Sequence, residues 1–158
     1  MAGVSGALRV MLVDDDAGFL GLVDAIFRRA KEDRRDAFGR SFPAELEITT
    51  AGDGFIAREL LGTKLTDGNR PDLLVVDLKM PRLDGIGLLK WIREEPRLVT
   101  VPVLMLSTSA TGSDVASSYA AGCNAYYQKP LRFEDLERLV GELVHHWTQW
   151  ARLFRRPG

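Results

Sequence analysis

The chain has 158 residues, a length typical of one domain with its own hydrophobic core. Hydrophobic residues make up 46% and charged residues 27%, a balance that excludes a disordered chain. The formal net charge of −1 does not favour nucleic acid as a partner, because nucleic-acid binding usually needs a concentrated basic face. A single cysteine, Cys123, excludes an internal disulfide framework and a cysteine-rich metal site, and it indicates a reducing compartment.

The amino-terminal apolar stretch is interrupted by Arg9 and ends in three aspartates, unlike the uninterrupted core of a signal peptide. No run approaches the ~20 apolar residues that a transmembrane helix needs. We therefore expect a soluble, cytoplasmic protein that spans no membrane.

In the first half of the chain, short apolar runs typical of strands alternate with segments whose apolar residues have the spacing of a helix. Residues 8–13 are nearly continuously apolar, which predicts a strand buried on both faces. Residues 19–30 have the spacing of a helix, residues 46–50 predict a second strand, and residues 55–61 predict a second helix ended by Gly62.

The second half continues the alternation. Residues 72–77 form the most apolar strand, and residues 86–93 predict a third helix. Residues 101–106 predict a fourth strand, residues 113–121 a fourth helix, and residues 124–128 a fifth strand. A final helix is predicted over residues 131–154.

Two connectors are long for their position, at residues 31–45 and 62–71. The first carries a charge run and the second is rich in turn-forming residues. We expect surface insertions, which are either solvated loops or loops that contact a partner.

Strands that alternate with helices predict an α/β fold with a parallel sheet covered on both faces. We expect a flavodoxin-like doubly wound five-stranded sheet in the order 2-1-3-4-5, with an extended carboxyl-terminal helix. One domain would cover residues 8–150, and residues 151–158 would form a basic tail that continues the last helix. With no room for a second domain, output would depend on protein contact.

Acidic residues follow the first and third predicted strands. In such sheets, ligands bind beyond the carboxyl ends of the strands, where the strand order reverses. This topology brings Asp14, Asp15 and Asp77 into one pocket, and carboxylates so close together repel one another unless a cation intervenes. Hard oxygen ligands without sulfur or imidazole indicate Mg²⁺.

Ser107 and Lys129 follow the fourth and fifth strands, at the same edge of the sheet. A hydroxyl and an ammonium beside a metal–carboxylate site suit phosphate chemistry. A carboxylate nucleophile would form an acyl phosphate, while the metal and Lys129 neutralise the phosphoryl oxygens and Ser107 donates a hydrogen bond.

Four motifs resemble the receiver domains of two-component response regulators. They are VDD at 13–15, PDLLVVDLKMPRLDG at 71–85, VLMLS at 103–107 and YYQKP at 126–130. The resemblance implies a signalling protein, not an enzyme, whose partner is a sensor histidine kinase.

The resemblance also implies a role for each matching residue. Asp77 would be the phosphoacceptor, with Asp14 and Asp15 as the acidic pair. Asp15 would be the likelier direct metal ligand, and Asp14 would act partly through water. The main-chain carbonyl of Lys79 would complete the protein ligands of Mg²⁺.

Further roles concern switching. Ser107 would be the switch hydroxyl, and Tyr126 the aromatic side chain that turns inward when Ser107 moves. Lys129 would neutralise the phosphoryl group, and Lys129–Pro130 would be a cis peptide, although cis occurs in only ~5–6% of such bonds.

Other polar residues have simpler structural interpretations. Asp16 stands just before the first helix and is expected to be its N-cap, and Asp84 before Gly85 indicates turn chemistry. Cys123 is expected to be a quiet, semi-buried thiol. His145 and His146 are expected to have surface or packing roles.

The last predicted helix would be about 36 Å long, whereas strands of this size span about 17–20 Å. Trp147, Trp150 and Phe154 would then extend beyond the sheet, and clustered exposed aromatics usually mark an interface. We expect a homodimer through the fourth helix, the fifth strand and the last helix. The alternative is an extension folded back on the monomer.

The insertions and this tail sharpen the resemblance to stand-alone regulators paired with phytochrome-type histidine kinases, including bacteriophytochromes. Ser107 replaces the threonine that is typical there.

Two other functions compete. A phosphatase of the haloacid-dehalogenase-like class would use an aspartate at the end of the first strand, and Asp14 and Asp16 have a matching spacing. That reading leaves Asp77 unexplained. A pseudo-receiver that no longer accepts phosphate is disfavoured by the complete residue set.

Overall fold

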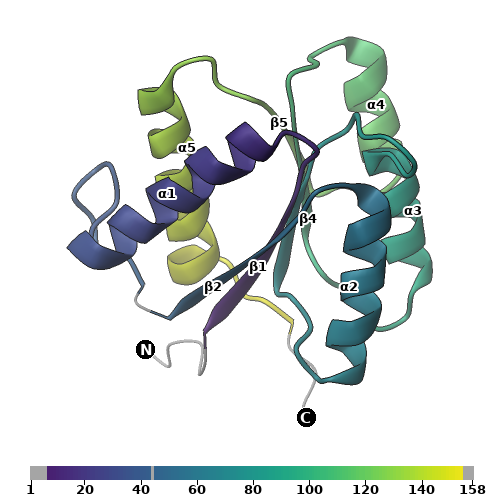
Figure 1. Cartoon of the computed structure of the whole chain (residues 1–158), viewed down its shortest axis with the longest axis horizontal. Coiled ribbons are helices and arrows are strands. Elements are labelled where there is room, and N and C mark those ends of the chain that lie inside the picture. Colours follow the sequence, from purple (N-terminus) through teal and green to yellow (C-terminus); the bar gives the residue numbers. More distant parts are fainter. Residues whose placement is uncertain (1–6, 44, 155–158) are drawn as a thin grey trace.

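The computed structural model describes residues 7–43 and 45–154, which form one parallel sheet between two layers of helices (Figure 1). The strands lie in the order β2-β1-β3-β4-β5, and every neighbouring pair is parallel. This confirms the predicted α/β sheet and its strand order. The strands are β1 (Leu8–Val13), β2 (Leu46–Ala51), β3 (Leu73–Val76), β4 (Val103–Ser107) and β5 (Ala125–Gln128).

Helices cover both faces of the sheet (Figure 1). One layer contains α1 (Ala17–Asp33) and α5 (Phe133–His145), and the other contains α2 (Gly54–Thr66), α3 (Gly85–Glu94) and α4 (Gly112–Ala120).

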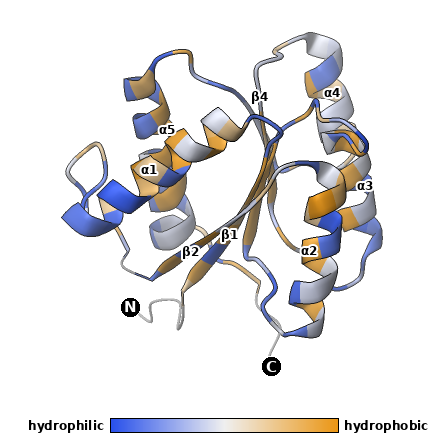
Figure 2. Ribbon diagram, in the orientation of Figure 1, coloured by the Kyte–Doolittle hydropathy of each residue, from blue (hydrophilic) through white to orange (hydrophobic). Residues whose placement is uncertain are grey.

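A hydrophobic cluster lies on each side of the sheet. Met11 packs in the cluster under α2 and α3, and Leu12 packs in the cluster under α1 and α5. Successive residues of β1 therefore face opposite layers. Burial on both faces explains why β3 and β4 are almost entirely hydrophobic, and orange predominates along the middle of the sheet in Figure 2.

Each strand was predicted to within two residues, but α1, α2 and α3 are longer than predicted. α2 passes through Gly62, where it was expected to end, and continues to Thr66. A glycine costs a helix only about 1 kcal/mol, and burial of Ala57 and Leu61 on the inner face offsets that cost. A β-carbon at Gly62 would meet open space, so this glycine occupies an outer helical position.

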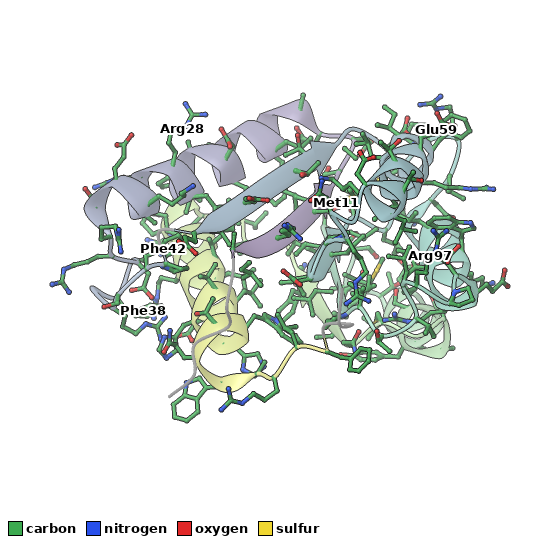
Figure 3. All side chains as sticks on the ribbon, turned by 90° about the horizontal axis from the view of Figure 1, so that it is seen from below. Met11, Arg28, Phe38, Phe42, Glu59 and Arg97 are labelled. Carbon is green, nitrogen blue, oxygen red and sulfur yellow. The ribbon has the colours of Figure 1, made fainter. Side chains whose placement is uncertain are left out.

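The first connector is not a free loop. α1 takes its first residues, and Arg40 and Phe42 anchor the following segment to the layer of α1 and α5 (Figure 3). Phe42 is only 3% exposed and packs edge-on against Phe27, with ring centroids 6.1 Å apart. Arg40 forms an ion pair with Glu142 of α5 at 3.5 Å.

The last helix is shorter than predicted. α5 ends at His145, a π-helical turn η1 (His146–Trp150) follows, and Ala151 takes an extended conformation. The Thr148 hydroxyl donates a hydrogen bond to the carbonyl of Val144 at 2.6 Å, within the region where the α-helix ends. The prediction that residues 151–158 continue the helix is therefore wrong for residues 151–154, and residues 155–158 lie outside the described part.

Residues 151–154 form a strap below the amino ends of the strands, and both Figure 1 and Figure 3 show it leaving the layer of α5. The guanidinium of Arg70 donates hydrogen bonds to the carbonyls of Phe154 at 2.7 Å and Arg97 at 3.0 Å. Because Arg70 precedes β3, this contact fixes the strap at the end of the sheet opposite Asp77. Within the described residues, no helix is long and apolar enough to cross a membrane.

Candidate functional site

Main-chain hydrogen bonds bring the residues after the strands together. The N–H of Asp77 donates to the carbonyl of Val13 at 2.8 Å, which places Asp77 beside Asp14. The N–H of Lys129 donates to the carbonyl of Ser107 at 2.7 Å. The carboxyl ends of four strands therefore deliver the four predicted residues to one edge of the sheet.

Asp14, Asp15 and Asp77 form a compact carboxylate cluster. One carboxylate oxygen from each lies within 4.8 Å of the others. Asp14 is 1% exposed and Asp77 is 7% exposed, whereas Asp15 faces solvent. Burial, with the charge of Asp14 adding to it, raises the pKa of Asp77 to about 6. Burial also raises the pKa of Asp14.

The positive charge of Lys129 offsets part of the repulsion between the carboxylates of Asp14 and Asp77. Its ammonium lies 2.5 Å from Asp14 Oδ2 and 3.6 Å from Asp77 Oδ2. The same ammonium lies 4.3 Å from the ring centroid of Phe19, a distance that allows a cation–π contact. This ammonium contacts two of the three carboxylates of the cluster.

The donor set fits a hard divalent cation. Carboxylate oxygens from two strand ends converge without sulfur or imidazole, and the exposed Asp15 leaves one side open to water. Mg²⁺ commonly binds through one or two carboxylates and keeps several waters. Such an ion would relieve the carboxylate repulsion that adds to burial in raising the pKa of Asp77.

Ser107 is buried at the end of β4, where its hydroxyl accepts a hydrogen bond from the N–H of Ser109 at 3.3 Å. Ser109 is also the partner of Tyr126, whose hydroxyl donates to the Ser109 carbonyl at 2.7 Å. The side chain of Ser109 bonds to Asp114 of α4. The predicted switch residues Ser107 and Tyr126 therefore meet through the loop between β4 and α4.

Asp114 was not singled out from the sequence. Its carboxylate lies 3.8 Å from the ammonium of Lys79, which follows β3. An open groove of about 840 Å³ runs from Asp15 past these two side chains and between α3 and α4. A lone aspartate in a helix's first turn gives no sequence signal for such a contact, because the partner is 35 positions away.

The predicted capping role of Asp16 is confirmed, whereas Asp84, expected to serve turn chemistry, caps a helix. Asp16 caps α1 by accepting from the N–H of Phe19, and Asp84 caps α3 by accepting from the N–H of Gly87. The thiol of Cys123 is buried, and burial raises its pKa.

One expectation at the site is wrong. No cis peptide bond occurs among the described residues, so Lys129–Pro130 is trans. Trans is the preferred form of a peptide bond before proline. The ammonium of Lys129 nevertheless reaches both buried carboxylates.

The three aromatic residues predicted for an interface lie away from this site. Trp147 is half-buried against the α1 and α5 cluster, whereas Trp150 is 74% and Phe154 is 57% exposed. The extension folds back on the monomer, which was the alternative interpretation, and the homodimer stays a prediction. Trp150 and Phe154, at the base of the molecule below the amino ends of the strands, remain exposed.

The sequence matches the family profile of the response regulator receiver domain over residues 10–141. The chain belongs to this family. Receiver domains of response regulators are phosphorylated on an aspartate in two-component systems.

Individual proteins are similar to this receiver domain over about nine tenths of its length. The probable methanogenesis regulatory protein FilR2 of Methanothrix harundinacea is 31% identical over 90% of this chain and 85% of its own length. The response regulator Rcp1 of Synechocystis is 27% identical over 91% of both chains.

Solved structures agree with the sequence relatives. The phosphorylated cyanobacterial phytochrome response regulator RcpA has a TM-score of 0.80 and 27% identity, covering 94% of this chain and 99% of its own. The Mn²⁺-bound form of Rcp1 has a TM-score of 0.76 and 26% identity, covering 93% and 99%.

Proposed function

We propose that this receiver domain accepts a phosphoryl group on Asp77 from a sensor histidine kinase and carries the signal by protein contact. The observation that carries the proposal is the position of Asp77, buried beside two further carboxylates and 3.6 Å from the ammonium of Lys129. On this proposal the chain is a signalling component and not an enzyme, and it acts in the cytoplasm.

In the transfer, an oxygen of the Asp77 carboxylate attacks phosphorus. The bond between phosphorus and the kinase histidine breaks, its electron pair returns to the imidazole, and an acyl phosphate forms. Lys129 neutralises phosphoryl charge, and Ser107 donates a hydrogen bond to a phosphoryl oxygen. Mg²⁺ held by Asp14, Asp15, Asp77 and the Lys79 carbonyl would supply further charge neutralisation.

The Ser107 hydroxyl accepts one hydrogen bond in this structure, and its own O–H can donate to a phosphoryl oxygen on Asp77. It now accepts from the N–H of Ser109, and the Ser109 carbonyl holds the Tyr126 hydroxyl. Movement of Ser107 towards Asp77 would therefore disturb both bonds of Ser109. The loop before α4 and the Tyr126 side chain would change together, which alters the outer surface.

A phosphotransfer assay tests this function. Radiolabelled phosphoryl groups from a panel of kinases, phytochrome-type kinases among them, should label the wild-type chain only with Mg²⁺ present. Asp77→Asn should abolish labelling, and Asp16→Asn, which keeps a capping oxygen, should label normally. Labelling of Asp77→Asn at wild-type level would refute the proposal.

The same samples separate the competing functions. Turnover of a phosphomonoester, with the label on Asp14, would favour the phosphatase. Absence of any response of the wild type to Mg²⁺ and beryllofluoride would favour the pseudo-receiver.

The partner proposal has two parts. Similarity to Rcp1 and RcpA supports a phytochrome-type kinase as the phosphodonor. The exposed Trp150 and Phe154 support a homodimer that includes α4, β5 and α5 together with the base of the molecule.

A further inference from the structure

The loop between β3 and α3 contains a residue in an unusual conformation. Arg82 has φ +66°, in the left-handed region that glycine adopts readily and other residues rarely do. A non-glycine residue keeps such a conformation only where its surroundings determine it. The contacts of the Arg82 side chain are therefore of interest, because they are what glycine would lack at this position.

That contribution is a contact with the start of α2. The guanidinium of Arg82 donates two hydrogen bonds to Asp53 Oδ2, from Nε at 3.0 Å and from Nη2 at 2.5 Å. It also lies 4.8 Å from the ring centroid of Phe55. Asp53 is itself fixed, because its Oδ1 caps α2 by accepting from the N–H of Ile56 at 2.8 Å.

The loop is also held by close backbone approaches. A β-carbon on Gly54 would lie 2.2 Å from the carbonyl oxygen of Leu83, so the start of α2 is seated directly against the loop. A β-carbon on Gly85 would lie 2.3 Å from the carbonyl oxygen of Asp77. The loop that carries Arg82 therefore packs closely against the start of α2 at Gly54, and the start of α3 packs closely against the backbone of Asp77 at Gly85.

We propose that Arg82, through Asp53, is a positioning residue that holds the β3–α3 loop in the conformation that binds the divalent cation. The loop begins at Asp77 and includes the Lys79 carbonyl, two of the ligands in the proposed function, on which this inference rests. Arg82 does not touch the ion. It fixes the backbone that presents the ligands, as outer partners do at metal sites.

Arg82→Gly is the decisive variant, because glycine accepts φ +66° without strain while the Asp53 contact is lost. Calorimetric titration with MgCl₂ should show a dissociation constant about 10-fold higher than wild type. The melting temperature in EDTA should stay equal or rise. Arg82→Lys and Asp53→Asn, which keep a cation or a capping oxygen, should weaken Mg²⁺ binding less.

Arg97→Ala is the matched control. It removes another arginine that pairs with a carboxylate, Glu95 at 2.9 Å, at the far end of α3. It should bind Mg²⁺ like wild type. The inference is overturned if Arg82→Gly binds Mg²⁺ as tightly as wild type. It is also overturned if the affinity falls only together with a lower melting temperature in EDTA. If wild type itself binds no Mg²⁺, the proposed function falls as well.

Discussion

At the scale of single residues, Asp77 carries a charge that the folded chain disfavours. Its pKa is raised from 3.8 to about 6 by burial and by the charge of Asp14. Between these values the folded state binds more protons than the unfolded state, so stability falls as the pH rises through this window. The penalty is complete above about pH 6 and absent below the unfolded value.

Asp77→Asn should therefore stabilise the protein without metal. At pH 7.5 in EDTA, the free energy of unfolding should rise by about 1–2 kcal/mol, because the repulsion with Asp14 and the desolvation of a charge are removed. At pH 4.5 most of this gain should vanish. Urea unfolding at both pH values measures the effect, with Asp16→Asn as a control that should change little. An equal gain at both pH values would contradict the assignment.

At the scale of elements, the first connector is a packed part of the fold. Phe42 is buried at the end of this connector, whereas Phe38, four positions earlier, is 42% exposed and contacts the guanidinium of Arg40 at 4.5 Å. The same residue type thus has two different environments within one short segment.

Phe42→Ala should lower the free energy of unfolding by about 3 kcal/mol, because it leaves a cavity beside Phe27. Phe38→Ala, the matched variant, should cost less than about 1 kcal/mol, since surface substitutions rarely cost more. Chemical denaturation measures both, and equal costs would show that the connector does not anchor through Phe42. Both variants should still accept phosphate on Asp77.

The sequence predicted the elements whose pattern is local. Continuous or alternating apolar runs located each strand to within two residues, and the strand order placed Asp14, Asp77, Ser107 and Lys129 at one edge of the sheet. This worked because topology alone determines which strand ends meet.

The features that the sequence did not predict depend on tertiary contacts, and these contacts leave no periodic pattern of apolar residues in the sequence. The end of α5 is followed by a strap held by Arg70, which is 84 positions from its partner Phe154. The left-handed Arg82 could not be foreseen either, because its stabilising partner Asp53 looks in the sequence like an ordinary helix cap.

At the scale of the whole molecule, two ends of the sheet have different roles. The carboxyl ends of the strands hold the proposed phosphorylation site. The strap lies below their amino ends (Figure 1), where Trp150 of η1 and Phe154 of the strap are exposed. A dimer that includes the base would therefore leave Asp77 accessible to a kinase.

Trp150→Ala should weaken dimerisation without abolishing labelling of Asp77 or lowering stability, since Trp150 is mostly in solvent. Trp147→Ala should weaken dimerisation and also destabilise the monomer, because Trp147 packs against the α1 and α5 cluster. Analytical ultracentrifugation measures the mass of each variant. A mass unchanged from wild type in both would exclude this interface.

The crowded carboxylates have a consequence for the history of the sequence. Neutral substitutions at position 77 would be favoured by thermodynamic stability alone, because they remove a burden on the fold. A requirement for folding alone would therefore not retain the charge of Asp77. That charge is a cost to stability which only a function of the carboxylate would repay.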